Sequence, residues 1–365
     1  MTITTLELDD SLAAALGPEA AELWRLHRGP APTRLHIARS ADGAPIAALL
    51  TTRRPATLST KIAHTWRSVD TVDSDVAFER LVDEVVTDAL ALGHVSVKWQ
   101  THDAPDSPAL VNFERLEFER LGFERMRAPY ASATGTEGVA GFVRWLRPVP
   151  HDEPPYYSQT STFTCGAVTA LVASEIRGSG GFAVDGDNRD HELDFWRRAS
   201  NYPSCEPVGL AVALRESLAD ASGASPVEVF LDTDKPVLLE SYPDGFDRTF
   251  REELQANSLR KALGSDIAVR RERVTVDQIS ARLRAGELAL LLIDLEPMFG
   301  FAVPHWVLAH AAADGVVIID DPWISASWGE TWVDAHELPV SAADLDRMLA
   351  WGDGGYRGVV FVTRG

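Results

Sequence analysis

The chain has 365 residues, of which 45% are hydrophobic and 24% charged, which is typical of a globular protein and not of a disordered or membrane-embedded one. This length exceeds the size at which a single hydrophobic core stops growing, so we expect two domains. The formal net charge of −20 argues against nucleic acid or an anionic membrane as the main ligand, and favours a cationic or neutral substrate.

No segment has the pattern of a membrane span or a targeting signal. The longest apolar runs, such as Leu288–Ile293, have the length of a strand and are too short to cross a bilayer. The first ten residues lack the basic and apolar regions of a signal peptide, so we expect a cytoplasmic protein that does not act at a membrane.

The cysteine content points to a reduced thiol and not to a disulfide framework. Cys165 and Cys205 are the two cysteines of the chain, and no His/Cys cluster has the spacing of zinc ligands. We therefore expect no metal and no cofactor.

The first half of the chain, residues 1–148, mixes strands and helices. Alternating residues flank an Asp-Gly turn and predict a hairpin, and a later segment carries apolar residues at helical spacing and ends at a glycine. The expected strands are Leu35–Ala38, Ile46–Thr52, Ala63–Val72 and Val95–Trp99, and the expected helices are Val76–Leu92 and Asn112–Leu121.

This order of elements resembles the GNAT acetyltransferase fold, and Asn112–Phe123 resembles the late helix of that family, which ends in Gly-Phe. In GNAT enzymes a loop rich in glycine and basic residues holds the pyrophosphate of acetyl-CoA. The corresponding segment here, Asp70–Ala77, carries three acidic residues and no glycine, and negative charge there repels a pyrophosphate. We expect a GNAT-like domain that has no acetyltransferase activity and has a binding or scaffolding role.

A proline-rich connector ends this half. The segment Arg147–Pro155 contains four prolines, and they favour extended, stiff backbone over helix. The predicted domains are therefore residues 1–148 and residues 152–365.

The second half carries a candidate nucleophile. Cys165 lies where a loop meets an apolar helical segment, and Gln159 lies six positions before it. A thiol at a helix N-terminus is stabilised as the thiolate by unpaired backbone N–H groups. An amide side chain upstream of the thiol can donate a hydrogen bond to an oxyanion. The alternative is a small buried cysteine, which is common for this residue type and is the interpretation we favour for Cys205.

A candidate base and its orienting carboxylate follow far downstream. His305 begins an apolar strand, and a turn at Asp314-Gly315 leads to a second strand that ends at Asp320-Asp321. In an antiparallel hairpin these ends are neighbours, so His305 is expected to meet one of the two aspartates. Adjacent strand residues face opposite sides, so either aspartate, but not both, is expected to be its partner.

Other histidines are assigned lesser roles. His310 lies five residues after His305 and therefore faces the opposite side of the strand, where we expect a structural group. His151 and His191 have polar, loop-like surroundings and are expected at the surface.

The motifs Gln159-x5-Cys165-Gly166, Pro304-His305-Trp306-Val307 and Asp321-Pro322 resemble the peptidase C39-like branch of the papain-like cysteine proteases. The resemblance covers Asp152 to the C-terminus. It implies that Cys165 is the nucleophile, His305 the general base and acid, Asp321 the orienting carboxylate and Gln159 the oxyanion donor. One departure is Glu206, which stands where related chains usually have glycine.

The expected architecture of the second half is α+β, with helices first and antiparallel strands later. Its expected helices follow Cys165, span Asp190–Ser200 and run from Pro207 to about Gly223. Its expected strands are Val227–Leu231, Val237–Glu240, Leu288–Asp294, Trp306–His310, Val316–Asp320 and Gly358–Val362.

The sequence predicts a hydrolase or acyltransferase that acts on a peptide or small-molecule amide or thioester through a Cys165 thioester. Whether water or an amine receives the acyl group is left open, as is the oligomeric state. The alternatives are a non-catalytic binding module in which both domains are degenerate, and a GNAT-type N-acetyltransferase.

Overall fold

A computed structural model of the protein describes residues 9–68, 72–102, 118–183, 187–218, 226–352 and 354–363. These residues form two compact units. One comprises the described residues up to Ala128 together with Glu137–Pro148 and Ser325–Asp334, and the other comprises Pro129–Thr136, Val149–Ile324 and the described residues from Ala335 onward. Neither unit is therefore one continuous stretch of chain.

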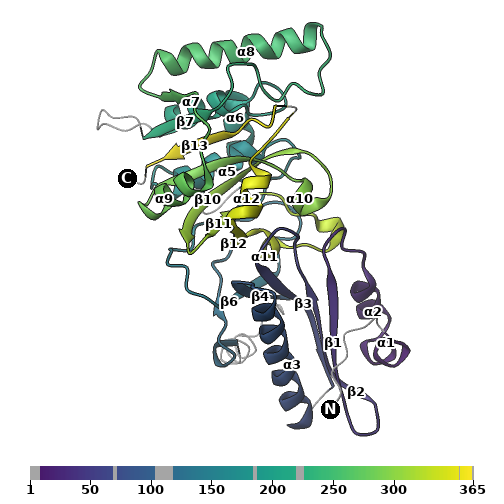
Figure 1. The fold of residues 1–365 in the computed structure, drawn as a ribbon. Helices are drawn as coiled ribbons and strands as arrows, with labels where there is room; N and C mark the ends of the chain where they lie inside the picture. Colours follow the sequence, from purple (N-terminus) through teal and green to yellow (C-terminus); the bar gives the residue numbers. More distant parts are fainter. Residues whose placement is uncertain are drawn as a thin grey trace. The chain divides into compact units, whose positions relative to one another are not determined.

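The first unit is a mixed sheet with the order β1-β2-β3-β4-β6-β5, in which β3 and β4 are parallel and the other pairs antiparallel (Figure 1). The helix α3 connects the parallel pair and packs on the sheet through a buried apolar face. The elements of the unit are α1 Asp10–Leu16, α2 Pro18–Arg25, β1 Thr33–Arg39, β2 Pro45–Thr52, β3 Ser59–Arg67, α3 Val72–Ala91, β4 Ser96–His102, β5 Glu124–Arg125, β6 Val139–Trp145 and the 3₁₀ turn η1 Ala326–Trp328.

The predicted hairpin and long helix of this unit are confirmed, but the third strand was placed too late. It spans Ser59–Arg67 and not Ala63–Val72, because Val72 already begins α3. The acidic segment after it therefore includes the first turn of a helix. Residues 69–71, and most of the expected helix Asn112–Leu121, lie outside the described residues.

The segment Ser325–Asp334 completes the first unit by packing on its sheet. A Cβ atom on Gly141 in β6 would lie 2.7 Å from the ring of Trp332, so glycine lets that ring lie directly on the strand. The indole N–H of Trp332 donates to the carbonyl of Val139 at 2.9 Å.

Buried ion pairs fasten the same segment. The guanidinium of Arg54 donates to the carboxylate of Glu330 at 2.9 Å, and the ammonium of Lys61 pairs with Asp334. These side chains are almost fully buried, and removal of one partner would leave an uncompensated charge in the interior.

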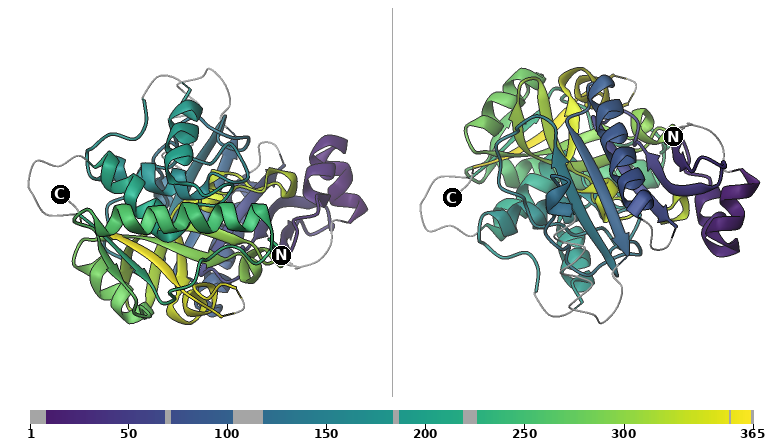
Figure 2. Two further views of the ribbon diagram at one scale, coloured as in Figure 1. Left: turned by 90° about the horizontal axis from the view of Figure 1, so that it is seen from above. Right: turned by 90° about the horizontal axis from the view of Figure 1, so that it is seen from below.

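The second unit is a sheet with the order β12-β11-β10-β9-β13-β7-β8, antiparallel except for the pair β7–β8. The helices α5 and α7 pack on it, and α8 packs on α7; seen from above, α8 (green) runs in front of its neighbours (Figure 2). The elements are α5 Cys165–Ile176, α6 Arg189–Ala199, α7 Pro207–Ser217, β7 Val227–Leu231, α8 Phe246–Leu263, β8 Ala268–Arg270, α9 Val276–Arg284, β9 Leu288–Asp294, α10 Glu296–Phe299, β10 Pro304–Ala313, β11 Val316–Asp320, α11 Trp332–Ala335 (mostly in the first unit), β12 Leu338–Ser341, α12 Ala342–Met348 and β13 Gly358–Val362.

The α+β class is confirmed. The strand β9 is apolar at nearly every position because both of its faces are buried: Leu288, Leu290 and Leu292 belong to the core shared with α5 and α7, and α9 also packs on β9.

Two expectations for this unit were wrong. Val237–Glu240 is not a strand, because Val237 exchanges its backbone hydrogen bonds with the side chain of Gln255 and Leu238 has a φ of 58°. The helix α7 ends at Ser217, earlier than expected.

Candidate active site

Cys165 is the first residue of α5, as the sequence predicts. The helix is buried at every position from Gly166 to Ser174, so it lies inside the core. A Cβ atom on Gly166 would lie 2.9 Å from Cβ of Cys205 and 3.1 Å from the ring of Trp306. Because Gly166 has no side chain, the start of the helix can approach Trp306 of β10 closely, and this close packing positions the thiol of Cys165.

The hairpin β10–β11 brings His305 and Asp321 together. Leu308 pairs with Asp320 in the ladder, so the start of β10 lies beside the end of β11. The Nε2 atom of His305 lies 2.7 Å from Oδ1 of Asp321, and both side chains are buried. The predicted neighbourhood of these two residues is confirmed.

Asp321 is held by contacts on its backbone as well as on its side chain. Its Oδ1 also accepts the backbone N–H of Trp323 at 2.8 Å, and its carbonyl accepts the hydroxyl of Tyr156 at 2.8 Å. Its own N–H donates to the carbonyl of Ala335 at 2.9 Å. A carboxylate fixed in this way sets the orientation of the His305 ring.

The thiol and the imidazole form a hydrogen-bonded pair in which each favours the charged form of the other. Burial opposes the ionisation of Cys165, but the charge of His305 and hydrogen bonds from the imidazole and from the backbone N–H groups of Trp306 and Gly166 hold the thiol pKa below its usual value. Burial also disfavours protonated His305, but the charges of Asp321 and Cys165 raise its pKa to about 10. Because Nε2 faces Asp321, Nδ1 is the ring nitrogen left for the thiol.

Gln159 is buried near the same loops. Its backbone N–H donates to the carbonyl of Pro322 at 2.9 Å, next to Asp321. Its side-chain Nε2 donates to the carbonyl of Ser161 at 2.7 Å, which uses one of the two N–H donors of the amide.

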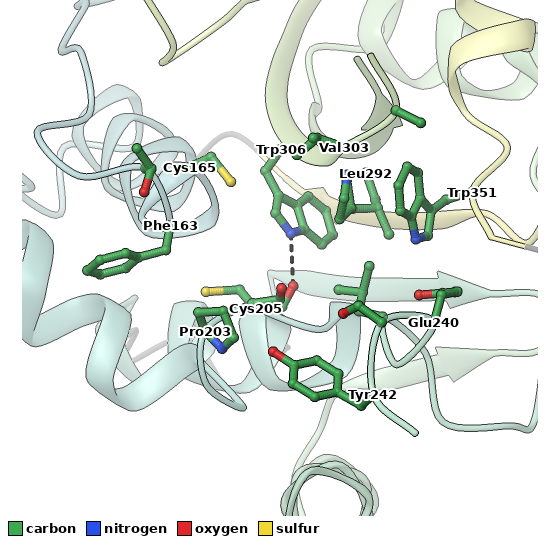
Figure 3. Close-up of a pocket in the computed structure, with 16 residues that line it drawn as sticks. Phe163, Cys165, Pro203, Cys205, Glu240, Tyr242, Leu292, Val303, Trp306 and Trp351 are labelled. Atoms are coloured by element: carbon green, nitrogen blue, oxygen red, sulfur yellow. Dashed lines mark hydrogen bonds between the residues drawn. The ribbon is translucent and has the colours of Figure 1, made fainter. Parts of the chain in front are cut away.

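A cavity of about 360 Å³ opens beside Cys165. Figure 3 shows Cys165 and Phe163 on one side of it and Trp351, Leu292 and Glu240 on the other, with Trp306 between them. The dashed bond in Figure 3 joins the Trp306 indole N–H to the carbonyl of Cys205 at 2.9 Å. The lining residues are Thr162, Phe163, Cys165, Pro203, Ser204, Cys205, Leu238, Glu240, Ser241, Tyr242, Leu292, Ala302, Val303, Pro304, Trp306 and Trp351.

The second thiol has the opposite electrostatics. Cys205 is buried in the core, and its burial together with the charges of Cys165 and Glu206 raises its pKa well above the usual value. The structural role expected for Cys205 fits this environment.

Glu206, the departure from the related chains, is the N-cap of α7. Its carboxylate accepts the backbone N–H groups of Val208 at 2.8 Å and Gly209 at 2.5 Å. These bonds satisfy buried backbone N–H groups that have no partner within the helix, so the Glu206 side chain stabilises the start of α7 and does not line the cavity.

Asp320 and the histidines other than His305 lie outside the group of Cys165, His305 and Asp321. Asp320 hydrogen-bonds to Nδ1 of His336 at 2.8 Å and lies 3.8 Å from Nε2 of His310, so it serves a separate set of residues. His310 is buried and His191 exposed, as expected. The surface position expected for His151 was wrong, because its ring is bonded to Glu337.

The comparisons with known proteins concern the two halves of the chain separately. A family model described as the Peptidase_C39 like family matches residues 154–363, which is more than half of the chain. The chain belongs to this family. Membership supports a hydrolase or acyltransferase and confirms the resemblance that the sequence motifs predict. No curated protein matches the chain.

Several of the solved structures that match are acetyltransferases. The aminoglycoside 6'-N-acetyltransferase from Enterococcus faecium aligns with a TM-score of 0.30 and 13% identity over 41% of this chain and all of its own length. A GNAT-family acetyltransferase from Staphylococcus aureus aligns with a TM-score of 0.30 and 9% identity over 40% of this chain and all of its own. The chain spans 66% of a nourseothricin acetyltransferase, with a TM-score of 0.26, 13% identity and 32% of this chain covered. The expected resemblance to GNAT folds is thus found among solved structures.

No helix among the residues that the structure describes is both long and apolar enough to cross a lipid bilayer.

Proposed function

We propose that the protein is a cysteine-nucleophile hydrolase or acyltransferase that opens an amide bond through a thioester on Cys165. The observation that supports this is the arrangement of partly buried Cys165 with buried His305 and Asp321, in which a thiol of lowered pKa is hydrogen-bonded to an imidazolium held by a carboxylate. Structural cysteines lack such a partner, and Cys205 in the same unit has a raised pKa.

In the first step the thiolate of Cys165 attacks the carbonyl carbon of the amide, and the carbonyl π electrons move to its oxygen. The backbone N–H groups at the start of α5 and the second N–H of Gln159 are the donors proposed for that oxyanion. When the tetrahedral intermediate collapses, the C–N bond breaks and protonated His305 gives its proton to the leaving amine.

In the second step a water molecule or an amine attacks the thioester carbon. Neutral His305 accepts the proton of this nucleophile, the C–S bond breaks, and the thiolate and imidazolium are restored. Asp321 holds the ring in one orientation throughout and stays ionised.

The cavity beside Cys165 supports a substrate with an apolar or aromatic group next to the scissile bond. Trp306, Trp351 and Leu292 supply apolar surface, and Glu240 places one carboxylate at the wall. Such walls bind by removing apolar surface from water, at about 25 cal/mol per Å².

The proposal is tested by trapping the acyl enzyme. The protein is incubated with a mixture of peptides, and the masses of the intact chain and of the peptide that contains Cys165 are measured. We expect an acyl adduct on Cys165 that is absent from Cys165→Ala, and its discharge to an added amine distinguishes transfer from hydrolysis. An adduct that persists in Cys165→Ala, or no adduct together with equal, slow alkylation of both thiols, would point to a binding module instead.

A further inference from the structure

A second cluster of titratable side chains surrounds the end of β11 in the second unit. It is built from segments far apart in sequence and shares no side chain with the group Cys165, His305 and Asp321. Its members are His151, Glu153, His310, Asp320, His336 and Glu337.

His336 is the centre of this cluster. Its ring is fully buried, with Nδ1 2.8 Å from Oδ1 of Asp320 and Nε2 3.1 Å from Oε1 of Glu153. Oδ1 of Asp320 also accepts the backbone N–H of Glu337 at 2.7 Å, so the carboxylate is fixed. Nδ1 therefore donates to Asp320, and Nε2 is the ring nitrogen that faces Glu153.

Glu337 presents a second carboxylate from a constrained backbone. Its φ is 51°, in the left-handed region that a residue with a long side chain rarely adopts, and its side chain is buried. Such a conformation persists where the surroundings impose it. Its carboxylate lies 2.6 Å from Nε2 of His151, whose Nδ1 donates to the carbonyl of Val149 at 2.6 Å.

We propose that Glu153, His336 and Glu337 form a binding site for a divalent transition-metal ion, with Zn²⁺ as the ion that fits best. One imidazole nitrogen and one oxygen from each carboxylate lie within 4.8 Å of one another, a spacing that one small ion can bridge. This mixed nitrogen and oxygen donor set suits zinc, whereas calcium requires six to eight oxygen ligands.

The surrounding hydrogen bonds support a metal more directly than the distances do. Asp320 holds Nδ1 of His336, which is the carboxylate–histidine arrangement that fixes the ring of a metal ligand and leaves Nε2 for the ion. His151 orients the carboxylate of Glu337 in the same way. The side chain of Glu153 is 27% exposed, which gives the ion a path from solvent and a position for a water ligand.

Glu153 lies shortly before Gln159 in the chain. His336 and Glu337 come directly after α11. Asp320 is the last residue of β11 and precedes Asp321. An ion at this site would join these three segments. Because the sequence separation between Glu153 and His336 is large, no ligand spacing in the sequence predicts it.

The experiment is a calorimetric titration with ZnCl₂ of the full chain carrying Cys165→Ser, so that the catalytic thiol does not contribute a ligand. We expect one ion per chain. Adding Glu153→Gln keeps a hydrogen-bond acceptor for His336 but removes a charged ligand. Loss of a partner at a metal site typically weakens metal binding by about 10- to 100-fold, so we expect zinc affinity to fall at least about tenfold. The matched control is Asp152→Asn, the same charge change at the exposed neighbouring position, which should bind as the parent does.

Thermal unfolding gives a second readout. We expect Zn²⁺ to raise the melting temperature of the parent and of Asp152→Asn but not that of Glu153→Gln. If Glu153→Gln does not fold, Glu337→Gln is used in its place. MgCl₂ should have no effect. Absence of zinc binding in the parent, equal binding in parent and Glu153→Gln, or equal binding of magnesium would each overturn the proposal.

Discussion

Asp320 and Asp321 are neighbours in the chain, yet their carboxylates contact different histidines. Oδ1 of Asp321 is 2.7 Å from Nε2 of His305, and Oδ1 of Asp320 is 2.8 Å from Nδ1 of His336. The last residue of β11 thus contributes to the proposed metal site and the residue after it to the candidate active site, and successive side chains of an extended chain point to opposite sides.

We expect iodoacetamide at neutral pH to alkylate Cys165 much faster than Cys205. The thiolate is the reactive form; His305 favours it at Cys165, whereas burial and the charges of Cys165 and Glu206 oppose it at Cys205. Peptide mapping by mass spectrometry after timed quenching measures both rates in one sample. Similar rates for the two thiols would contradict the assignment of Cys165 as nucleophile.

Asp321→Asn should move the alkylation of Cys165 to higher pH. Asp321 helps to raise the pKa of His305 to about 10, and protonated His305 in turn lowers the pKa of the thiol. Without the carboxylate the imidazolium loses its proton at lower pH, the thiol pKa rises, and the rate near pH 6 falls. Turnover should fall on the order of 10²- to 10⁴-fold, the range for a disabled general acid and base.

The control for this change is Asp314→Asn, at the exposed tip of the same hairpin. Its φ of 47° suits asparagine, and the charge change is identical. We expect its pH profile to match that of the wild type. If both variants shift the profile equally, the effect is one of net charge and not of the His305–Asp321 bond.

Glu206→Gln should change how stability depends on pH. Burial raises the pKa of Glu206 from 4.5 to about 7, although hydrogen bonds from Val208 and Gly209 act in the other direction. Between these values the folded protein keeps a proton that the unfolded chain releases, so wild-type stability falls as the pH rises through this window, by at most about 3 kcal/mol.

The variant has no such group, so its stability relative to wild type should increase from about pH 5 to about pH 8. Chemical denaturation at the two pH values measures the difference. Glu216→Gln, at an exposed position of the same helix, is the control and should show a constant difference. A constant difference for Glu206→Gln as well would show that its carboxylate is ionised throughout.

Val303→Trp should obstruct the cavity without disturbing the thiol. Val303 lines the cavity and is 40% exposed, so a larger ring there narrows the space beside Cys165 and need not enter the core. We expect turnover of a peptide substrate to fall on the order of 10²-fold through misplacement, while alkylation by iodoacetamide stays unchanged. Phe301→Trp, a 42% exposed residue nearby that does not line the cavity, should retain activity. Retained turnover in Val303→Trp would place the substrate elsewhere.

The sequence predicted the parts of the site that depend on local pattern. The helix start at Cys165 and the hairpin that joins His305 to Asp321 follow from apolar periodicity and one Asp-Gly turn. The strand expected at Val237–Glu240 failed because a side chain, Gln255, takes the place of a neighbouring strand. His151 was misplaced because its partner, Glu337, lies 186 positions away, and no local pattern records such a contact.

The placement of Trp332 has a consequence for how this protein can be divided experimentally. A fragment cut at the proline-rich connector would contain β6 and Gly141 but not the indole that lies on them, and the remaining fragment would carry that indole and the partners of Lys61 and Arg54 without their sheet. The proline-rich connector therefore does not separate the two compact units, because Ser325–Asp334 belongs to the first of them. An excised C-terminal half would need polar residues in place of the apolar ones in Ser325–Asp334 before its behaviour could be compared with that of the whole chain.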